Sequence, residues 1–542
     1  MAYPVTGRVQ CTDPTPIPPL AMDSITTCAV ILASTFLLQW LKKSLWPKLP
    51  FPPGPIGYPI IGNMLDVPSV MPWKTYRDWS KVYGDVIFLN LPGSSLVVLG
   101  SAQAAVDLLE KRSDIYSDRP ISVLHQMMSW DWNLAFMPYT PLWRNQRREF
   151  HQFFNSGQVS KYQPIQLREC RAFLQRLLNS PSADLGQNIR HVFTAIILKV
   201  TYDMDISDLR NEYVLFAQEA VDGLSRVTVP GVYWVEFFPF LRHVPSWVPG
   251  TSSRRLAEYY KPIVEIMRDK AFDDIKQDMA NGKESPSVAA ALLSRLYKKA
   301  GEDDANLIDD KVARNVAGLA YAAAADTTTS AGQSFLIAMS LYPDVQRNAQ
   351  EELDRVVGPN RLPDFRDNDE LVYVRAVVLE AMRWMSVAPL GIAHRVTRDD
   401  EYRGCLIPKG TIVSANIWAM LNNPEDYPEP EVFNPGRFLK DGKLNPAVRD
   451  PLTLAFGFGR RVCPGRYLSN GSLFMMIASI LHTFNIIPTA GEDRKRFDPA
   501  MDTVTGLVSA PSYIPCKVVP RSKGAECLIN SNRHSSSMSE GL

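Results

Sequence analysis

The segment from Phe456 to Gly465 surrounds one cysteine with residues that favour metal-ligand chemistry. It reads Phe-Gly-Phe-Gly-Arg-Arg-Val-Cys-Pro-Gly, and Arg461 stands two residues before Cys463. The residues 466–480 have the pattern of an amphipathic helix, so Cys463 lies just before a helix N-terminus. A nearby cation and the positive end of a helix both favour the thiolate over the thiol. A thiolate among backbone N–H groups suits the axial position of a haem iron, and glycines let backbone approach a flat ligand closely.

A buried structural cysteine in a tight loop is the alternative interpretation, and the surrounding pattern argues against it. The loop resembles that of the cytochrome P450 (haem-thiolate) family, whose pattern is Phe-x-x-Gly-x-Arg-x-Cys-x-Gly. The matching residues are Phe456, Gly459, Arg461, Cys463 and Gly465. The resemblance implies a haem b whose iron is ligated by the Cys463 thiolate, with Phe456 and Arg461 among the residues that bind the cofactor.

Other residues would hold the haem propionates if the resemblance extends to them. Trp143 and Arg147 are four residues apart and share one face of a predicted helix. In the family such a pair holds a propionate, and a guanidinium can bind a carboxylate through two parallel hydrogen bonds. Arg461 is a further candidate. So is one of the neighbours His394 and Arg395, and the sequence leaves open which of these two reaches the propionate.

A buried ion-pair cluster is expected from Glu380 and Arg383. They are three residues apart on one predicted helix and can pair, although Glu352 and Arg355 have the same spacing and are expected to be an exposed pair. In the family, an arginine from a later segment completes a Glu-Arg-Arg cluster, and here that arginine is Arg437. Buried charges need partners, so the cluster would act as a structural lock near the haem.

A predicted helix over 311–341 carries an acid followed by three threonines, Asp326-Thr327-Thr328-Thr329. These residue types are poor helix formers, so a polar break in an apolar helix calls for a reason. The stretch resembles the acid–alcohol pair that the family places above the iron. By that resemblance Thr327 would hydrogen-bond dioxygen and water, and Asp326 would help relay protons. The alternative is a capping or surface threonine cluster.

Two positions depart from the family pattern. Gly436 stands where the family usually has Glu, and because Arg437 is retained, only a local change is expected. Ala324 stands where the family often has Gly. Its extra methyl group is expected to narrow the groove over the iron, which affects the size of the pocket rather than the chemistry.

The order of the motifs resembles that of microsomal family members, most closely enzymes of fungal secondary metabolism such as O-methylsterigmatocystin oxidoreductase. The implied reaction inserts one oxygen atom from O2 into a lipophilic small molecule, a terpenoid or polyketide-type intermediate. NADPH electrons would come from a separate cytochrome P450 reductase, with cytochrome b5 as a further candidate partner, since the chain shows no flavin or nicotinamide motif. Two alternatives are an isomerase or dehydratase of the same fold that does not use O2, and a haem-binding membrane protein without turnover.

The composition bounds the remaining function classes. The 542 residues include 58 basic and 57 acidic side chains, so nothing in the net charge indicates nucleic-acid binding. Hydrophobic residues make up 46% and charged residues 21%, which excludes a wholly disordered chain. Seven cysteines are too few for a disulfide scaffold. Reductase docking would therefore use a local basic face, for which the candidates are Arg144, Arg148, Arg460 and Arg466.

A mainly α-helical body with a small β portion must position these residues. Apolar residues three and four apart predict helices over 143–154, 311–341 and 369–387. Strand-like runs occupy 86–91, 96–99 and 411–416. Because residues for one haem are spread from Trp143 to Cys463, residues 56–521 are expected to form one catalytic domain with the cytochrome P450 fold.

The N-terminal residues predict a membrane anchor. Residues 25–41 are uncharged and stand at the short end of the length needed to cross a hydrocarbon core of about 30 Å. Lys42 and Lys43 follow, so the C-terminal side should face the cytoplasm, whereas a signal peptide would carry its charge before the apolar core. The expected order is a lumenal segment (1–24), one transmembrane helix (25–41) and a basic, proline-rich hinge (42–55). The protein would then be a single-pass enzyme of the endoplasmic reticulum with a cytoplasmic catalytic domain.

Two further segments carry expectations about the surface. Residues 229–248 are rich in aromatic side chains and are expected to dip into the bilayer and admit a lipophilic substrate, with core packing as the alternative. The last residues, 522–542, are polar and rich in serine, and are expected to be a disordered tail.

Overall fold

The computed structural model describes residues 34–35, 37–38, 49–180, 184–208, 210–228, 233–248, 250–299, 309–489 and 503–538. The chain divides into two units, one of Pro52–Asp400 with Ile407–Leu542 and one of Met1–Phe51 with Glu401–Leu406. The first unit contains every site described below. The predicted lumenal segment and nearly all of the predicted anchor lie outside the described residues. In the part of the chain that the structure describes, no helix is both long enough and apolar enough to span a bilayer.

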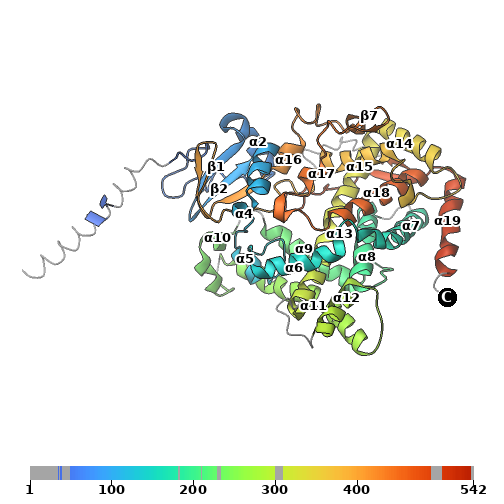
Figure 1. Cartoon of the computed structure of the whole chain (residues 1–542), viewed down its shortest axis with the longest axis horizontal. Coiled ribbons are helices and arrows are strands. Elements are labelled where there is room, and N and C mark those ends of the chain that lie inside the picture. Colours follow the sequence, from blue (N-terminus) through green and yellow to red (C-terminus); the bar gives the residue numbers. More distant parts are fainter. Residues whose placement is uncertain are drawn as a thin grey trace, which may run out of the picture. The chain divides into compact units, whose positions relative to one another are not determined.

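Helices dominate the first unit, as predicted (Figure 1). The helices up to residue 299 are α2 (Pro72–Tyr83), α3 (Ala102–Ala105), α4 (Ser113–Tyr116), α5 (Val123–Met127), α6 (Pro141–Phe154), α7 (Gln163–Asn179), α8 (Leu185–Tyr202), α9 (Glu212–Val227), α10 (Trp234–Phe237), α11 (Ser252–Ala280) and α12 (Val288–Lys299). The later helices are α13 (Asp310–Leu341), α14 (Pro343–Val356), α15 (Val372–Trp384), α16 (Ile417–Leu421), α17 (Leu452–Ala455), α18 (Arg466–Thr483) and α19 (Lys523–Met538). The three helices predicted from periodicity correspond to α6, α13 and α15.

The β portion is small, again as predicted. The strands are β1 (Val86–Leu91), β2 (Ser94–Leu99), β3 (His394–Arg395), β4 (Asp400–Tyr402), β5 (Cys405–Ile407), β6 (Ile412–Ala415), β7 (Leu439–Lys440), β8 (Lys443–Leu444), β9 (Phe484–Pro488) and β10 (Cys516–Pro520). A four-stranded sheet has the order β1-β2-β6-β3. Strand β6 is parallel to β2 and antiparallel to β3, with His394 opposite Val413. This pairing connects the first strands of the body to the segment that contains His394.

Helix α13 is the central element for the site. The Asp309 carboxylate caps its N-terminus by accepting a hydrogen bond from the Val312 N–H at 2.7 Å. The helix packs against α6, α8, α15 and α18. Its alanine-rich middle lets these neighbours approach closely, which brings elements from distant parts of the sequence around a single segment.

Helix α18 begins at Arg466 as predicted, but it is not amphipathic. Consecutive residues Met475, Met476 and Ile477 are all fully buried, so that every side of this part of the helix faces protein. The reason is its position, since α7, α13, α14 and α15 all pack against it. A helix covered on all sides does not need a polar face.

The prediction of a disordered C-terminal tail is wrong for the described residues, because α19 spans Lys523–Met538. The helix packs against α7 and α18. Ala525 and Ile529 are buried at i and i+4, and the Gln175 amide donates a hydrogen bond to the Ile529 carbonyl at 3.4 Å. The short apolar stretch is therefore enough to dock the helix, despite the serine-rich sequence that follows it.

Candidate active site

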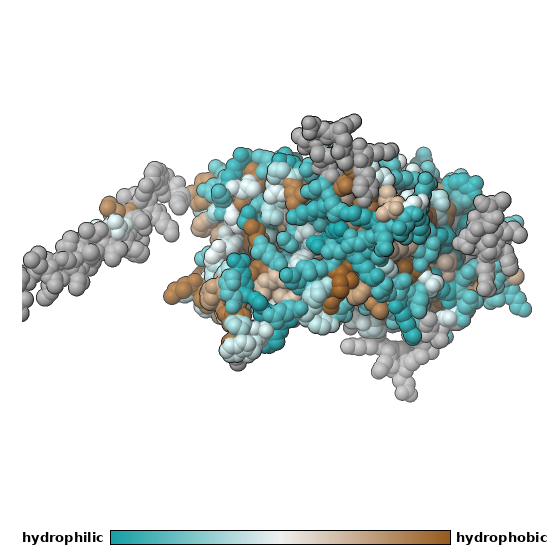
Figure 2. Space-filling view, turned by 90° about the horizontal axis from the view of Figure 1, so that it is seen from below, coloured by the Kyte–Doolittle hydropathy of each residue, from teal (hydrophilic) through white to brown (hydrophobic). Residues whose placement is uncertain are grey.

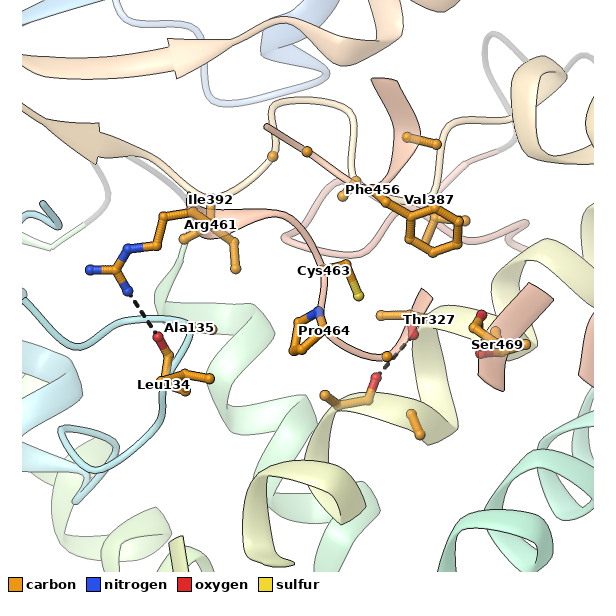
Figure 3. Close-up of a pocket in the computed structure, with 18 of the residues that line it drawn as sticks. Leu134, Ala135, Thr327, Val387, Ile392, Phe456, Arg461, Cys463, Pro464 and Ser469 are labelled. Atoms are coloured by element: carbon orange, nitrogen blue, oxygen red, sulfur yellow. Dashed lines mark hydrogen bonds between the residues drawn. The ribbon is translucent and has the colours of Figure 1, made fainter. Parts of the chain in front are cut away.

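A cavity of about 310 Å³ brings most of the predicted site residues together. Helices α6, α8 and α13 contribute to its walls, as do the segment after α15 and the cysteine loop before α18. Cys463 and Thr327 project into this cavity from different elements (Figure 3). Most of the other lining side chains are apolar, among them Phe150, Phe154, Phe193, Ile196, Leu319 and Val387. The walls therefore suit a large flat apolar group more than a polar ligand.

The cysteine loop is shaped by contacts with neighbouring backbone. The Cys463 N–H donates to the Phe456 carbonyl at 2.8 Å, which closes the loop. Gly459 has φ +55°, and a Cβ atom at this position would collide with the Leu109 carbonyl oxygen. Only glycine therefore fits at Gly459. The close approach that Gly459 permits is to the backbone near Leu109, rather than to a ligand in the cavity as the sequence suggested.

The electrostatics of Cys463 differ from the prediction. Burial raises the pKa of the thiol, and this effect outweighs the N–H groups of Gly465 and Arg466 and the positive charges of Arg147 and Arg466. The expectation that Arg461 and the helix end would favour the thiolate is therefore wrong for the side chain by itself, because desolvation dominates. A metal ion coordinated by this sulfur would supply the missing positive charge, since a coordinating thiol loses its proton.

Three of the predicted propionate residues lie at one end of the cavity. Trp143, Arg147 and Arg461 all line it, and the Arg461 guanidinium stacks 4.2 Å from the centre of the Trp143 ring. The guanidinium groups are held by backbone oxygens: Arg147 donates to the Val462 carbonyl at 2.6 Å, and Arg461 donates to the Leu134 carbonyl at 3.1 Å (Figure 3). Burial lowers the pKa of Arg147 to about 10 and that of Arg461 to about 9. Cations held this way favour an anionic ligand.

The structure separates the two neighbours that the sequence left open. His394 lines the cavity, and its Nδ1 is 2.7 Å from the Tyr116 carbonyl oxygen. Arg395 does not line the cavity, because its guanidinium pairs with the Asp118 carboxylate at 2.6 Å. The alternation of side chains along β3 turns these two residues in opposite directions. Of the two, only His394 is placed to meet a group in the cavity.

Arg119 is a cavity residue that the sequence interpretation missed. It is buried, lines the cavity and donates hydrogen bonds to the carbonyls of Ala135 at 2.9 Å and Ala393 at 2.8 Å. No local signal marks it, since the preceding residues 110–117 read Glu-Lys-Arg-Ser-Asp-Ile-Tyr-Ser and are themselves rich in charge. A buried arginine in such a place needs several acceptors, and a local pattern does not show that distant carbonyls supply them.

Asp326 and Thr327 are adjacent in sequence but face different neighbours. Thr327 lines the cavity, and its hydroxyl donates to the Ala323 carbonyl at 2.9 Å (Figure 3). Asp326 points toward α8, where Arg190 is 3.2 Å away. Burial raises the pKa of Asp326, and Arg190 opposes this effect. Ala324 also lines the cavity, so its methyl group occupies space there as the sequence indicated.

Glu380, Arg383 and Arg437 meet in the interior. Arg383 donates through Nε to Glu380 Oε2 at 2.7 Å, and Arg437 donates through Nε to Glu380 Oε1 at 3.2 Å. The Asn434 N–H donates to the same carboxylate at 2.8 Å. At Gly436, a Cβ atom would approach the Asn434 side-chain oxygen to 2.9 Å, which is the oxygen that caps this turn. The departure from the family pattern at Gly436 is thus accommodated by a local turn.

Comparison with known proteins places the chain in a family. Residues 52–516 match the family model for cytochrome P450. The chain belongs to the cytochrome P450 family. Cytochrome P450 monooxygenase COX1 of Coprinopsis cinerea is 40% identical over 94% of this chain and 100% of the relative. Cytochrome P450 monooxygenase ple1 of Rhodocybe pseudopiperita is 39% identical over 92% and 95%, and tryptamine 4-monooxygenase of Psilocybe cyanescens is 37% identical over 87% and 93%.

Membership of the cytochrome P450 family establishes the type of reaction and the cofactor. The P450 is a monooxygenase that works with haem-thiolate, O2 and electrons supplied by a reductase. The relatives are named monooxygenases, which favours the oxygen-insertion reaction over the two alternatives considered from the sequence. The cavity fits the cofactor, because it combines one cysteine sulfur, apolar walls and guanidinium groups at one end.

Proposed function

We propose that Cys463 ligates the haem iron of this P450 and that the enzyme oxidises a neutral, lipophilic small molecule. The observation that carries the proposal is the arrangement of the cavity, in which Cys463 and Thr327 face a common apolar space with Arg119, Arg147 and Arg461 at one end. The thiolate-ligated haem supplies the oxygen-activating chemistry. The guanidinium groups of the three arginines bind the two propionates and so fix the orientation of the haem.

Thr327 and Asp326 are proposed to bind water and to transfer protons. Thr327 Oγ1 donates its proton to the Ala323 carbonyl, which leaves its lone pairs at the cavity wall able to accept a hydrogen bond from water or another donor there. Asp326, whose pKa is raised by burial, takes up protons on the α8 side of the helix. The apolar walls exclude bulk water, so protons reach the reaction through these side chains instead of through solvent. The Glu380 cluster stiffens the protein beneath the cysteine loop.

The reduced, carbon-monoxide-bound spectrum tests the ligand assignment. We expect the wild-type protein to absorb at the unusually long wavelength of a thiolate-ligated haem. Cys463→Ala should abolish this band because it removes the sulfur. Cys170→Ala is the matched control, since Cys170 is fully buried on α7 and does not line the cavity. A long-wavelength band that survives in Cys463→Ala would contradict the assignment.

We propose a terpenoid or polyketide-type substrate of fungal secondary metabolism, and the mainly apolar lining of the cavity is consistent with such a molecule. Among the described residues that line it, the charged and titratable side chains other than Cys463 are Arg119, Arg147, His394 and Arg461, all at the propionate end. A neutral apolar substrate would then meet no uncompensated charge. Microsomes supplied with reductase and NADPH would be incubated with terpenoid and polyketide precursors and, as a contrasting amine, tryptamine. Oxidation of the neutral precursors is expected. Oxidation of tryptamine alone would contradict the substrate class.

We further propose that the enzyme is anchored in the endoplasmic reticulum membrane through residues 25–41, with the catalytic domain in the cytoplasm. In the aromatic segment that is predicted to dip into the bilayer, the exposed fraction is 62% for Trp234, 65% for Phe240 and 81% for Trp247. Figure 2 shows hydrophobic residues gathered at the left of the molecule, where Figure 1 places α10. Exposed aromatic side chains of this kind favour a membrane interface. In intact microsomes, added protease should digest the catalytic domain, and protection of the domain would contradict this orientation.

A further inference from the structure

We propose that Asp118 is a positioning residue for the part of the cavity that Arg119, Arg147 and Arg461 line, which we call the arginine end. Asp118 would keep this part in the shape that retains haem, without itself touching the cofactor. This inference rests on the proposed function, because it assumes that the haem propionates lie at that end. Asp118 is absent from the cavity lining and was not singled out by any motif in the sequence. Its role follows from what its carboxylate and its neighbours hold.

The Asp118 carboxylate joins two segments that are far apart in the sequence. Oδ2 accepts hydrogen bonds from Arg395 Nη2 at 2.6 Å and from Arg395 Nε at 3.0 Å. Oδ1 accepts a hydrogen bond from the Tyr139 N–H at 2.8 Å. The side chain of Asp118 is 10% exposed, so these contacts form in a largely desolvated place. Burial by itself would raise the pKa of Asp118, but these hydrogen bonds outweigh it and lower the pKa, which keeps the group ionised.

The residues around Asp118 contact or supply polar side chains that line the cavity. The Tyr116 carbonyl oxygen lies 2.7 Å from His394 Nδ1, and the Ser117 carbonyl accepts a hydrogen bond from Arg461 Nε at 2.7 Å. The next residue is Arg119, which itself lines the cavity. Tyr116 and Ser117 therefore each contact one cavity side chain, and Arg119 is itself a third. A shift of the segment would misplace all of them together.

Two bonds to β3 fix the position of this segment. The Arg395 N–H donates to the Asp118 carbonyl at 2.8 Å, which forms an isolated β-bridge. The Asp118–Arg395 side-chain ion pair reinforces the same junction. The bond from Tyr139 fixes the other end of the loop that runs from Asp118 to Tyr139, and this loop contributes Leu134 and Ala135 to the cavity wall.

Charge adds a second reason for an acid at this position. Burial and the charge of Arg461 lower the pKa of Arg119, and Asp118 opposes both effects. Burial also lowers the pKa of Arg461, with Asp118 again opposing and Arg147 adding to the shift. Asp118 therefore compensates a group of like charges that otherwise repel one another before propionates are bound.

Transfer of haem to excess apomyoglobin, followed by absorbance, tests the inference. Asp118→Asn keeps an oxygen that can accept the Tyr139 hydrogen bond but removes the charge that Arg395 requires. Loss of a supporting partner of this kind typically costs about 10- to 100-fold in affinity. We therefore expect haem loss to become about tenfold faster or more. Because Cys463 is untouched, the long-wavelength band should remain, and added haem should restore full occupancy.

Asp114→Asn is the matched control. Asp114 lies four residues before Asp118 and forms an ion pair with Arg398 at 2.9 Å. Unlike Asp118, it is largely exposed: the exposed fractions are 52% for Asp114 and 67% for Arg398. Exposed pairs contribute little, so haem loss should stay within about twofold of wild type. Equal rates for Asp118→Asn and wild type would overturn the inference, and so would an equal acceleration in Asp114→Asn.

Variants of Arg395 keep the inference testable if Asp118→Asn accumulates poorly. Arg395→Gln removes the same ion pair, so it should accelerate haem loss and add little to Asp118→Asn in the double variant. Arg395→Lys retains a charged partner and should give a rate between wild type and Arg395→Gln. A wild-type rate in Arg395→Gln would overturn the inference. A wild-type protein without the long-wavelength band would instead contradict the proposed function, so the two failures are distinguishable.

Discussion

At the scale of residues, identical spacing has different consequences because burial differs. Glu380 and Arg383 are fully buried and 2.7 Å apart, and Arg437 joins them. Glu352 and Arg355 have the same spacing, yet they are 3.9 Å apart and Arg355 is 71% exposed. The Glu352 carboxylate is only 10% exposed, but it accepts hydrogen bonds from the N–H groups of Tyr373 and Val374 instead. Solvent screens an exposed pair, whereas a buried carboxylate between two guanidinium groups has no replacement partner in water. Spacing identifies both pairs, and burial decides which one matters for stability.

Glu380→Gln should strongly destabilise the enzyme. The substitution keeps the size of the side chain but leaves the charges of Arg383 and Arg437 without their shared carboxylate. Removing one partner from a buried ion pair typically costs about 3–5 kcal/mol of unfolding free energy. Urea unfolding of the holo-protein would measure this, with Glu258→Gln as the control because Glu258 pairs with Arg254 on the exposed face of α11. Unfolding curves of Glu380→Gln that coincide with those of wild type would refute the prediction.

At the scale of elements, two adjacent residues of α13 face different parts of the protein. Successive helical residues are about 100° apart, so Thr327 faces the cavity while Asp326 faces Arg190 on α8. Both side chains belong to the same rigid element, which fixes their relative position. The helix carries the polar pair through an otherwise apolar interior because each residue finds a hydrogen-bond or ion-pair partner.

Thr327→Ala should uncouple electron consumption from product formation. It removes the hydroxyl group at the cavity wall and leaves the apolar packing largely intact. Loss of a proton-transfer group typically costs at least about 100-fold in the assisted step, so the hydrogen peroxide released per NADPH should rise and product should fall. Thr327→Ser retains the hydroxyl and should restore most of the coupling. If Thr327→Ala forms product as efficiently as wild type, Thr327 has no part in proton transfer.

At the scale of the whole molecule, local charge matters more than net charge. The chain is almost neutral, but Arg144, Arg148 and Arg460 are exposed, while Arg466, the fourth predicted docking residue, is half-buried. Arg144 and Arg460 both lie against the ring of Tyr139, at 5.7 and 5.5 Å from its centre. Their charged ends are therefore held close together, which gives the surface a basic patch that an acidic face of a reductase could meet.

Charge reversal in this patch should weaken reductase docking. For Arg144→Glu combined with Arg148→Glu, we expect the KM for reductase to rise about tenfold at low salt, with kcat at saturating reductase nearly unchanged, because charges at the rim mainly change association. The difference should shrink as salt screens the charges. Arg366→Glu, at an arginine that is 85% exposed outside this patch, is the control. An unchanged KM in the double variant would exclude these arginines from the docking surface.

Much of the fold and part of the site could be predicted from the sequence because their signals are local. The periodicity over 311–341 reflects a helix that forms from its own residues, and it corresponds to α13. The cysteine loop was recognisable because the residues of its motif, including Gly459 and Cys463, lie within ten residues of one another. Its contact with the distant Leu109 carbonyl could not be predicted in this way. The predictions of a disordered tail and of an amphipathic helix at α18 were wrong because they depend on contacts that are not local. Helix α19 packs on α7, and α18 is buried by elements that are distant in the sequence.

The sequence by itself determined the residue types of the site and their order along the chain: the single cysteine in its loop, the acid–threonine pair and the Glu380 cluster. Only the tertiary structure decided how these residues are used. It placed Arg119 in the cavity, turned Arg395 away toward Asp118, and directed Asp326 toward α8. The physical reason is that these positions depend on partners distant in the chain, such as the 277 residues that separate Asp118 from Arg395. Burial, which sets the pKa of Cys463 and the strength of each ion pair, exists only once those partners have met.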